Sequence, residues 1–221
     1  SPLPKMIPQK KKMGAKSWWC ALCICFTFMY VGNYISTIIL SIMEGIFQHT
    51  TSNPVETMTA ESGIIIDIVF VAILAPMLEE ILFRKIICNK LLPLGEGYAV
   101  VISAAIFGIG HGNFYQFAYA FMLGVLFALI YVKTGKLRYS IGYHMIFNLF
   151  GGIIAPKLVE FADIEGAMEL LEQAKPALED ALLCLAKMTP MMIYAMLYMG
   201  VVALGAVLII RALVKKKVRF E

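Results

Sequence analysis

Charge is scarce in this sequence. Only 15% of its 221 residues are Asp, Glu, Lys or Arg, while 60% are hydrophobic. Soluble domains ordinarily contain about a quarter charged residues and about half apolar ones. This shortage excludes an ordinary soluble domain. It predicts an all-α integral membrane protein, a polytopic bundle of helices that forms a single domain over residues 1–221.

Motifs of several other protein classes are also missing. The five cysteines show no disulfide framework, and the C-x-x-C pair Cys20 and Cys23 lies in an apolar run without a second pair or a nearby histidine. We interpret these cysteines as apolar packing residues. No internal repeat and no nucleotide-binding glycine pattern is present. The lysines and arginines flank the apolar segments, which argues against a nucleic-acid partner and gives an orientation signal instead.

The apolar segments predict about six transmembrane helices, although two of them are short for a full crossing. The segments cover residues 18–42, 63–92, 98–111, 117–132, 139–154 and 191–214. The connection 157–190 is acidic and carries leucines at helical spacing, which predicts amphipathic helices on the outer surface. Sixteen of the 19 lysines and arginines fall on the side shared by both termini. By the positive-inside rule, we expect both termini to be cytoplasmic.

Three charged residues interrupt the second apolar segment, which reads APMLEEILFRKII around Glu79, Glu80 and Arg84. Each such charge costs roughly 2.5–3.5 kcal/mol at the centre of a bilayer, so we expect them to be functional. Glu80 and Arg84 have the i,i+4 spacing and order of a favourable ion pair. Glu79 is rotated by about 100° from Glu80 and is left as a carboxylate for general-base chemistry. The alternative is that the span ends near Glu79 and that all three charges lie in the headgroup layer.

Two further apolar segments contain histidines. His111 follows FGIG near a predicted helix end, where a core or interfacial histidine is the alternative to a catalytic one. His144 and Asn148, in HMIFN, have i,i+4 spacing and project from one face of a helix. Two neighbouring N–H donors in an apolar setting suit an oxyanion hole. A hydrogen-bonded contact between helices is the alternative for this pair.

The ordered motifs E-E-x-x-x-R, F-x-x-x-H and H-x-x-x-N resemble the CPBP or Abi family of intramembrane proteases, which includes the type II CAAX prenyl endopeptidases. The resemblance runs from Pro76 to Asn148, and we expect a catalytic core at about residues 62–154. It implies that Glu79 and His111 activate a water molecule.

The same resemblance gives roles to the remaining motif residues. It implies that His144 and Asn148 stabilise the oxyanion of the tetrahedral intermediate. It implies also that Glu80 and Arg84 support the geometry of the site.

The resemblance further implies an intramembrane endopeptidase of a bacterial cell membrane. Its expected partners are membrane lipid and a substrate, either a membrane-associated, CAAX-like or prenylated protein or a small peptide precursor. The favoured mechanism requires no cofactor, and the sequence has no H-E-x-x-H motif. The alternative is a zinc ion held by Glu79, His111 and His144.

Two functions of other classes stay open from the sequence. One is a non-catalytic membrane protein that binds peptides or confers bacteriocin immunity through the same polar cavity. The other is a small transporter with a proton relay through Glu79 and Asp67, although no inverted repeat is visible.

Overall fold

The protein is described by a computed structural model that covers residues 11–48, 63–172 and 177–215. Within these ranges all regular structure is helical, because backbone groups in lipid must be satisfied within their own segment. The elements are α1 (Ala15–Phe47), α3 (Ile64–Asp67), η1 (Ile68–Leu74), α4 (Ala75–Glu80), η2 (Ile81–Cys88), α5 (Asn89–Leu91), η3 (Leu92–Leu94), α6 (Glu96–Gly110), α7 (Phe114–Thr134), α8 (Leu137–Phe147), η4 (Asn148–Ile154), α9 (Ala155–Ala162), α10 (Ile164–Glu172) and α11 (Leu178–Val214).

The predicted polytopic helical bundle is confirmed. Four of the described helical stretches are long and apolar enough to cross a membrane: Ala15–Phe47, Phe114–Thr134, Leu137–Leu170 and Leu178–Val214. The other two predicted spans are helical as well. One is α6, with 15 residues, and the other is the interrupted stretch from α3 to α5. The count of six crossings stays a prediction.

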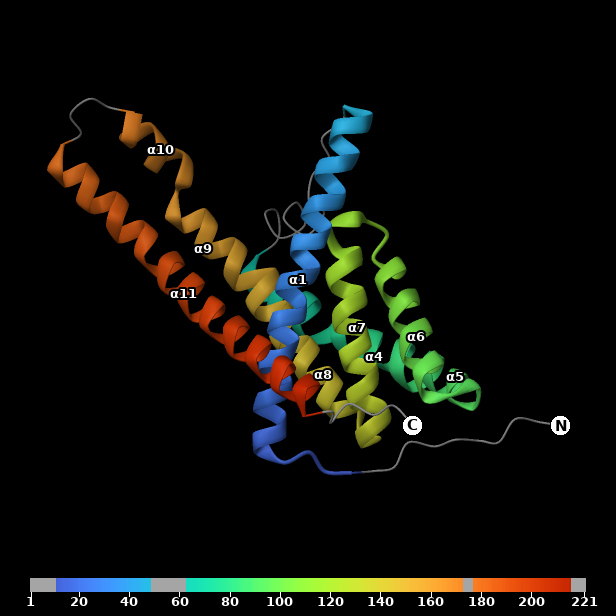
Figure 1. Cartoon of the computed structure of the whole chain (residues 1–221). Helices are drawn as coiled ribbons and strands as arrows, with labels where there is room; N and C mark the ends of the chain where they lie inside the picture. Colours follow the sequence, from blue (N-terminus) through green and yellow to red (C-terminus); the bar gives the residue numbers. More distant parts are fainter. Residues whose placement is uncertain (1–10, 49–62, 173–176, 216–221) are drawn as a thin grey trace.

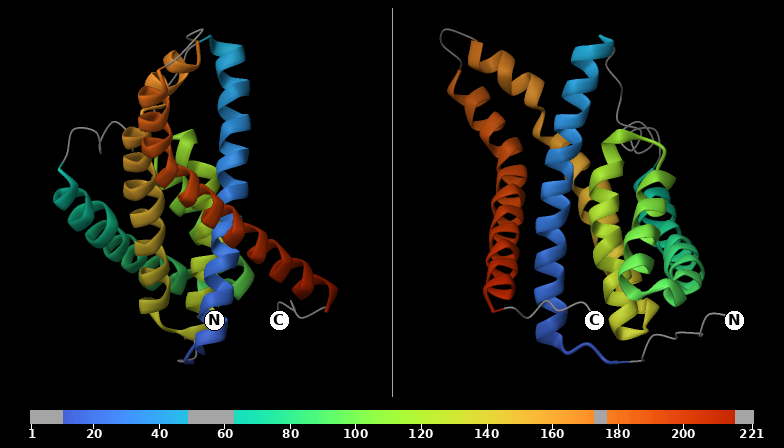
Figure 2. Two further views of the ribbon diagram at one scale, coloured as in Figure 1. Left: turned by 90° about the vertical axis from the view of Figure 1, so that its left-hand side faces the viewer. Right: turned by 45° about the vertical axis from the view of Figure 1, so that its right-hand side comes forward.

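The stretch from α3 to α5 differs from the other predicted spans in direction and in helical geometry. It runs obliquely to the long helices (Figure 2, left). Wider π-type turns make up η1 and η2, and η1 ends directly before the Ala75–Pro76 step. Proline has no N–H to donate, so a change in hydrogen-bond pattern at this point is expected. Such π-type turns inside helices occur often at functional sites.

Helix α1 lies between α7 and α11 (Figures 1 and 2). Two glycines allow this close packing. Gly32 of α1 lies against the backbone of Tyr119 on α7, and Gly205 of α11 lies against Cys23 and Thr27 of α1. The Thr27 hydroxyl also donates a 2.8 Å hydrogen bond to the carbonyl of Val202. Small residues let helix backbones approach in this way in membranes.

Helix α1 begins and α11 ends at the same end of the molecule, where α7 and α8 are also joined (Figure 1). This arrangement suits an even number of crossings. The cytoplasmic location of this end stays a prediction. Five of the ten basic residues at the two ends of the chain lie outside the described residues: Lys5, Lys10, Lys216, Lys217 and Arg219.

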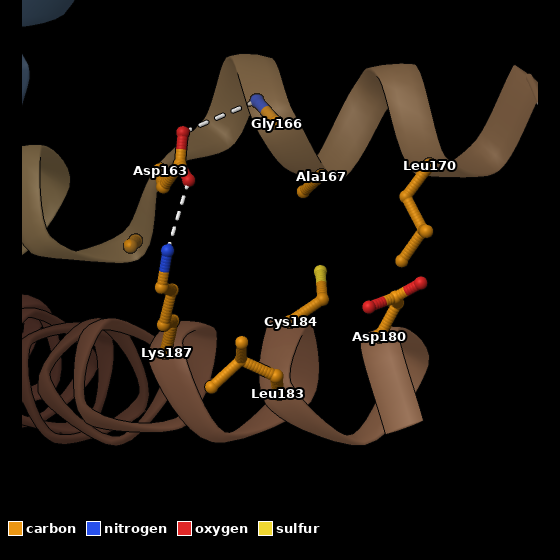
Figure 3. A pocket seen from close by; sticks show the side chains of 9 residues that line it. Asp163, Gly166, Ala167, Leu170, Asp180, Leu183, Cys184 and Lys187 are labelled. Atoms are coloured by element: carbon orange, nitrogen blue, oxygen red, sulfur yellow. Dashed lines mark hydrogen bonds and ion pairs between the residues drawn. The ribbon is translucent and has the colours of Figure 1, made fainter. Parts of the chain in front are cut away.

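The connection 157–190 is helical, but its boundary with the last predicted span is wrong. Residues 178–190 do not form a separate helix, because α11 runs without a break from Leu178 through Pro190 to Val214. Residues 173–176 lie outside the described part. Between α10 and α11 is a hollow of about 140 Å³, where Lys187 forms a 3.0 Å ion pair with Asp163 (Figure 3). Asp163 also accepts a hydrogen bond from the backbone N–H of Gly166, at the start of α10.

The packing of α1 on α11 generates a test. We expect Gly205→Leu to lower the free energy of unfolding by about 1–3 kcal/mol, because a side chain there must displace the α1 backbone. Gly200→Leu is the matched control, since Gly200 lies on the same helix with open space around its Cα. Thermal unfolding in detergent, followed with a thiol-reactive dye that reports exposure of Cys25 and Cys88, measures both variants. Equal melting temperatures for the two variants would contradict the close contact.

Candidate active site

A buried ion pair forms the centre of the candidate site. Glu80 at the end of α4 and Arg84 in η2 are fully buried, and Nε of Arg84 lies 3.1 Å from Oε2 of Glu80. Both charged side chains are thus enclosed by protein. The ion pair follows from the i,i+4 spacing, and the surrounding helices exclude solvent from it.

His144 of α8 lies between the two glutamates. Its Nδ1 is 3.2 Å from Oε1 of Glu80, and its Nε2 is 3.6 Å from Oε2 of Glu79. The His144 side chain is 5% exposed, whereas the Glu79 side chain is 33% exposed. The hydroxyl of Ser140, one turn earlier on α8, also lies beside the Glu80 carboxylate. Glu79 is therefore the more exposed glutamate of the pair, although its Oε2 atom, which faces His144, is itself buried.

His111 is held in a short turn between α6 and α7. It follows the last residue of α6, and Gly112 continues the chain with φ of 68°. Asn113 then caps α7 by accepting from the N–H of Gln116, and its amide donates to the His111 carbonyl at 2.8 Å. Left-handed φ values favour glycine, and asparagine is a preferred N-cap, so this local sequence explains where α6 ends.

The tautomer of His111 follows from its hydrogen bond. Nδ1 lies 2.8 Å from the carbonyl oxygen of Phe107, one turn earlier on α6. A carbonyl oxygen only accepts, so Nδ1 is assigned as the donor. The Nε2 atom of the neutral ring is then an acceptor, which suits a residue that orients a water molecule.

Asn148 makes a contact between helices. Its side-chain amide donates a 2.9 Å hydrogen bond to the carbonyl of Val71 in η1. A hydrogen-bonded contact between helices is the alternative to an oxyanion role that we gave for this residue from the sequence. The amide nitrogen carries two hydrogens, so one donor of Asn148 is left for another acceptor.

Phe107 joins the two histidines. Its ring packs edge-on against His111 at 4.8 Å and against His144 at 5.5 Å between ring centroids. Phe127 of α7 packs against the same His144 ring at 5.4 Å. The structure thus brings His111 and His144 to one buried ring, although they lie 33 positions apart in the chain.

Sequence reasoning missed three residues of the site. Phe107 was present in the F-x-x-x-H motif, and its i,i+4 relation to His111 was a signal for contact. Ser140 precedes His144 by four positions, so the same helix face was also readable. Phe127 carries no local signal, because its contact with His144 depends on how α7 packs.

The three residues of the zinc alternative, Glu79, His111 and His144, are not arranged as a metal site. Among the described residues, no three His, Cys, Asp or Glu side chains are arranged to hold a metal ion. His144 directs Nδ1 to Glu80, and the Phe107 ring packs against both imidazoles. We therefore derive no step through a metal. The hollow between α10 and α11 includes none of the predicted site residues.

Taken together, the fold and the site define a polytopic helical membrane protein with a glutamate–histidine cluster buried among its helices. Residues 61–150 match the family model described as type II CAAX prenyl endopeptidase Rce1-like. The family resemblance is thereby confirmed for this stretch of the chain.

Two curated relatives are similar to part of the chain. The membrane-embedded CAAX protease MroQ of Staphylococcus aureus (strain USA300) is 32% identical over 132 residues, which cover 57% of this chain and 53% of the relative. The putative membrane peptidase YdiL of Bacillus subtilis (strain 168) is 36% identical over 84 residues, or 38% of this chain and 34% of the relative. The chain thus matches about half or less of these relatives. No solved structure matches it.

The buried ion pair generates a second test. We expect Arg84→Met to destabilise the protein by about 3–5 kcal/mol, because it leaves Glu80 buried without its partner. The double variant Glu80→Met/Arg84→Met should regain most of this loss, since it removes both charges together. Lys133→Met breaks the partly exposed pair with Glu96 and should cost less than about 1 kcal/mol. Unfolding in detergent measures all three, and a double variant as unstable as Arg84→Met would refute the compensation.

Proposed function

We propose that this chain is an intramembrane endopeptidase that hydrolyses a peptide bond in a membrane-associated protein or a small peptide precursor. The observation that carries this proposal is the Glu79 side chain, which is partly exposed and places its buried Oε2 atom 3.6 Å from Nε2 of the buried His144 ring. Both residues lie inside the segment that matches the endopeptidase family model. A carboxylate beside an imidazole is a suitable general base with a neighbouring donor.

In the proposed reaction, Glu79 accepts a proton from a water molecule whose oxygen attacks the carbonyl carbon of the scissile bond. Nε2 of His111 accepts a hydrogen bond and orients that water. The tetrahedral intermediate then collapses, and the bond between carbon and nitrogen breaks. The proton held by Glu79 passes to the departing nitrogen, which gives a carboxylic acid and an amine. The acid then loses its proton, and the amine takes one up, so that the products are a carboxylate and an ammonium group.

The proposed oxyanion donors are His144 and Asn148. His144 uses Nδ1 for Glu80, so it can donate to the oxyanion from Nε2 when the ring carries both protons. Asn148 keeps one amide hydrogen beyond its bond to Val71, and that bond fixes the side chain. Fixed donors stabilise negative charge without reorganisation, which supports this assignment.

The proposed role of Glu80 and Arg84 is support. Glu80 accepts from His144 and sets the ring orientation, while Arg84 neutralises Glu80 within the protein. A hydrogen bond to the second ring nitrogen commonly determines the tautomer and orientation of a catalytic histidine.

We propose a substrate with a CAAX-like C-terminus, with or without a prenyl group. One relative is named as a CAAX protease, and the matching family model is that of CAAX prenyl endopeptidases. The bundle presents its apolar helix surfaces to membrane lipid, and both relatives are bacterial. We therefore propose the cell membrane of a bacterium, with cytoplasmic termini, as the location.

The mechanism predicts the outcome of removing the general base. Glu79→Gln should lower the cleavage rate by at least about 100-fold without unfolding the protein, because general-base catalysis contributes about 10²–10⁴-fold. His111→Ala should also abolish most cleavage. Mass spectrometry of CAAX-type peptides, prenylated and unprenylated, incubated with the protein in detergent measures this.

The control for Glu79→Gln is Glu160→Gln, which removes an equal charge from an exposed side chain paired with Lys157. It should cleave at the wild-type rate. Normal cleavage by Glu79→Gln would refute the mechanism. A wild type that binds peptides without cleaving them would favour the non-catalytic membrane peptide-binding or immunity function.

The mechanism without a cofactor predicts that chelation has no effect. The wild type incubated with EDTA or 1,10-phenanthroline should keep its cleavage rate within about twofold, because Glu79 itself removes the proton. The chelator-treated protein is assayed with the same peptides, and its zinc content is determined by mass spectrometry of the element. Loss of activity that zinc alone restores would establish the zinc alternative.

A further inference from the structure

Arg84 is buried without the hydrogen bonds that a buried guanidinium ordinarily makes. Its side chain has no exposed surface, and none of its three nitrogens has a hydrogen-bond partner among the residues that the structure describes. The contact of Nε with Glu80 is short but is not aligned as a hydrogen bond. Buried charges are normally both paired and hydrogen-bonded. Something other than hydrogen bonds must therefore hold this side chain in place.

Two aromatic rings supply the missing contacts. The Arg84 guanidinium carbon lies 4.6 Å from the centroid of Phe107 and 5.8 Å from that of Phe127. Both distances are within the range of cation–π attraction, which strengthens when the cation is shielded from water. The same two rings contact the imidazole of His144, at 5.5 and 5.4 Å between centroids. Phe107 and Phe127 therefore touch both partners of Glu80.

The two rings are themselves held in position. Phe107 is 2% exposed and Phe127 is fully buried. Phe83 packs edge-on against Phe107 at 5.1 Å. On the other side, a Cβ added at Gly124 would lie only 3.0 Å from the Phe107 ring. The packing of α6 against α7 thus determines where the rings lie.

We propose that Phe107 and Phe127 are positioning residues that hold Arg84 over their ring faces and pack against the imidazole of His144. The rings fix Arg84, Arg84 fixes Glu80, and Glu80 orients His144 toward Glu79. This inference rests on the proposed function. According to this inference, aromatic contacts hold the His144 ring in position, and hydrogen bonds to Arg84 do not.

A purely structural role would make the rings interchangeable with any apolar side chain of similar volume. Methionine offers such a volume without a ring face, whereas tyrosine keeps the face. The test therefore compares Phe107→Met, Phe127→Met and Phe107→Tyr in the full chain. Phe26→Met is the control, because the Phe26 ring contacts only Phe147 and Tyr198 among the ring contacts of the described residues.

We expect Phe107→Met and Phe127→Met to lower kcat by about tenfold while KM changes by less than about twofold. Phe107→Tyr should keep kcat within about threefold of the wild type, and Phe26→Met should leave kcat unchanged. The same peptide assay, together with melting temperatures, gives these values. The inference is overturned when Phe107→Met lowers kcat no more than Phe26→Met does.

A second measurement does not depend on cleavage. The chain has three histidines, so the ring signals of ¹⁵N-labelled histidine can be assigned by replacing each histidine in turn. We expect the His144 ring signals to shift in Phe107→Met and to stay in place in Phe26→Met. Unchanged His144 signals in Phe107→Met refute the positioning role. A wild type that cleaves no peptide refutes the proposed function, while the His144 signals still decide whether the rings set the imidazole.

Discussion

The ion pair between Glu80 and Arg84 is the interaction on which the rest of the site depends. Moving two charges out of water is costly, and their attraction offsets that cost only in good geometry. The protein surrounds both side chains completely and adds His144 on one side and two aromatic rings on the other. The oblique stretch from α3 to α5 is thereby tied to α6, α7 and α8 at one point. The side chain of the preceding residue, Glu79, stays partly exposed, so the two neighbouring glutamates differ in their surroundings.

Local spacing predicted much of this site, and long-range packing explains what it did not predict. The i,i+4 relation of Glu80 and Arg84 was enough to pair them, since both lie on one stretch of helix. The contacts of His144 with Glu80 and Glu79 join residues 64 and 65 positions apart and depend on the crossing of α4 and α8. The hydrogen bond from Asn148 to Val71 and the contact of Phe127 with His144 also depend on how separate helices pack. Periodicity along one helix carries no information on such crossings.

In the fold, too, some features were predictable from the sequence and others were not. Composition and apolar length predicted the helical bundle, and each of the six apolar segments corresponds to a helical stretch. They did not predict that residues 178–190 continue into α11, because the acidic, amphipathic pattern there resembles a surface helix and Pro190 resembles a boundary. Hydropathy also did not predict the π-type turns of η1, η2 and η4. Elements η1 and η2 flank α4, which carries Glu79 and Glu80, and η4 begins at Asn148. Irregular helix geometry is therefore concentrated around the motifs.

The length of α11 has a consequence for how the protein responds to ionic strength. Its 37 residues rise about 55 Å, whereas the hydrocarbon core of a bilayer is about 30 Å thick. The end near Leu178 therefore reaches toward water, and the bond between Asp163 and Lys187 lies there with both side chains more than a third exposed. Counter-ions screen such a bond but do not reach charges enclosed by protein. High ionic strength thus weakens the ion pair that joins α10 to the first part of α11 and leaves the electrostatics of the buried Glu80–Arg84 pair intact.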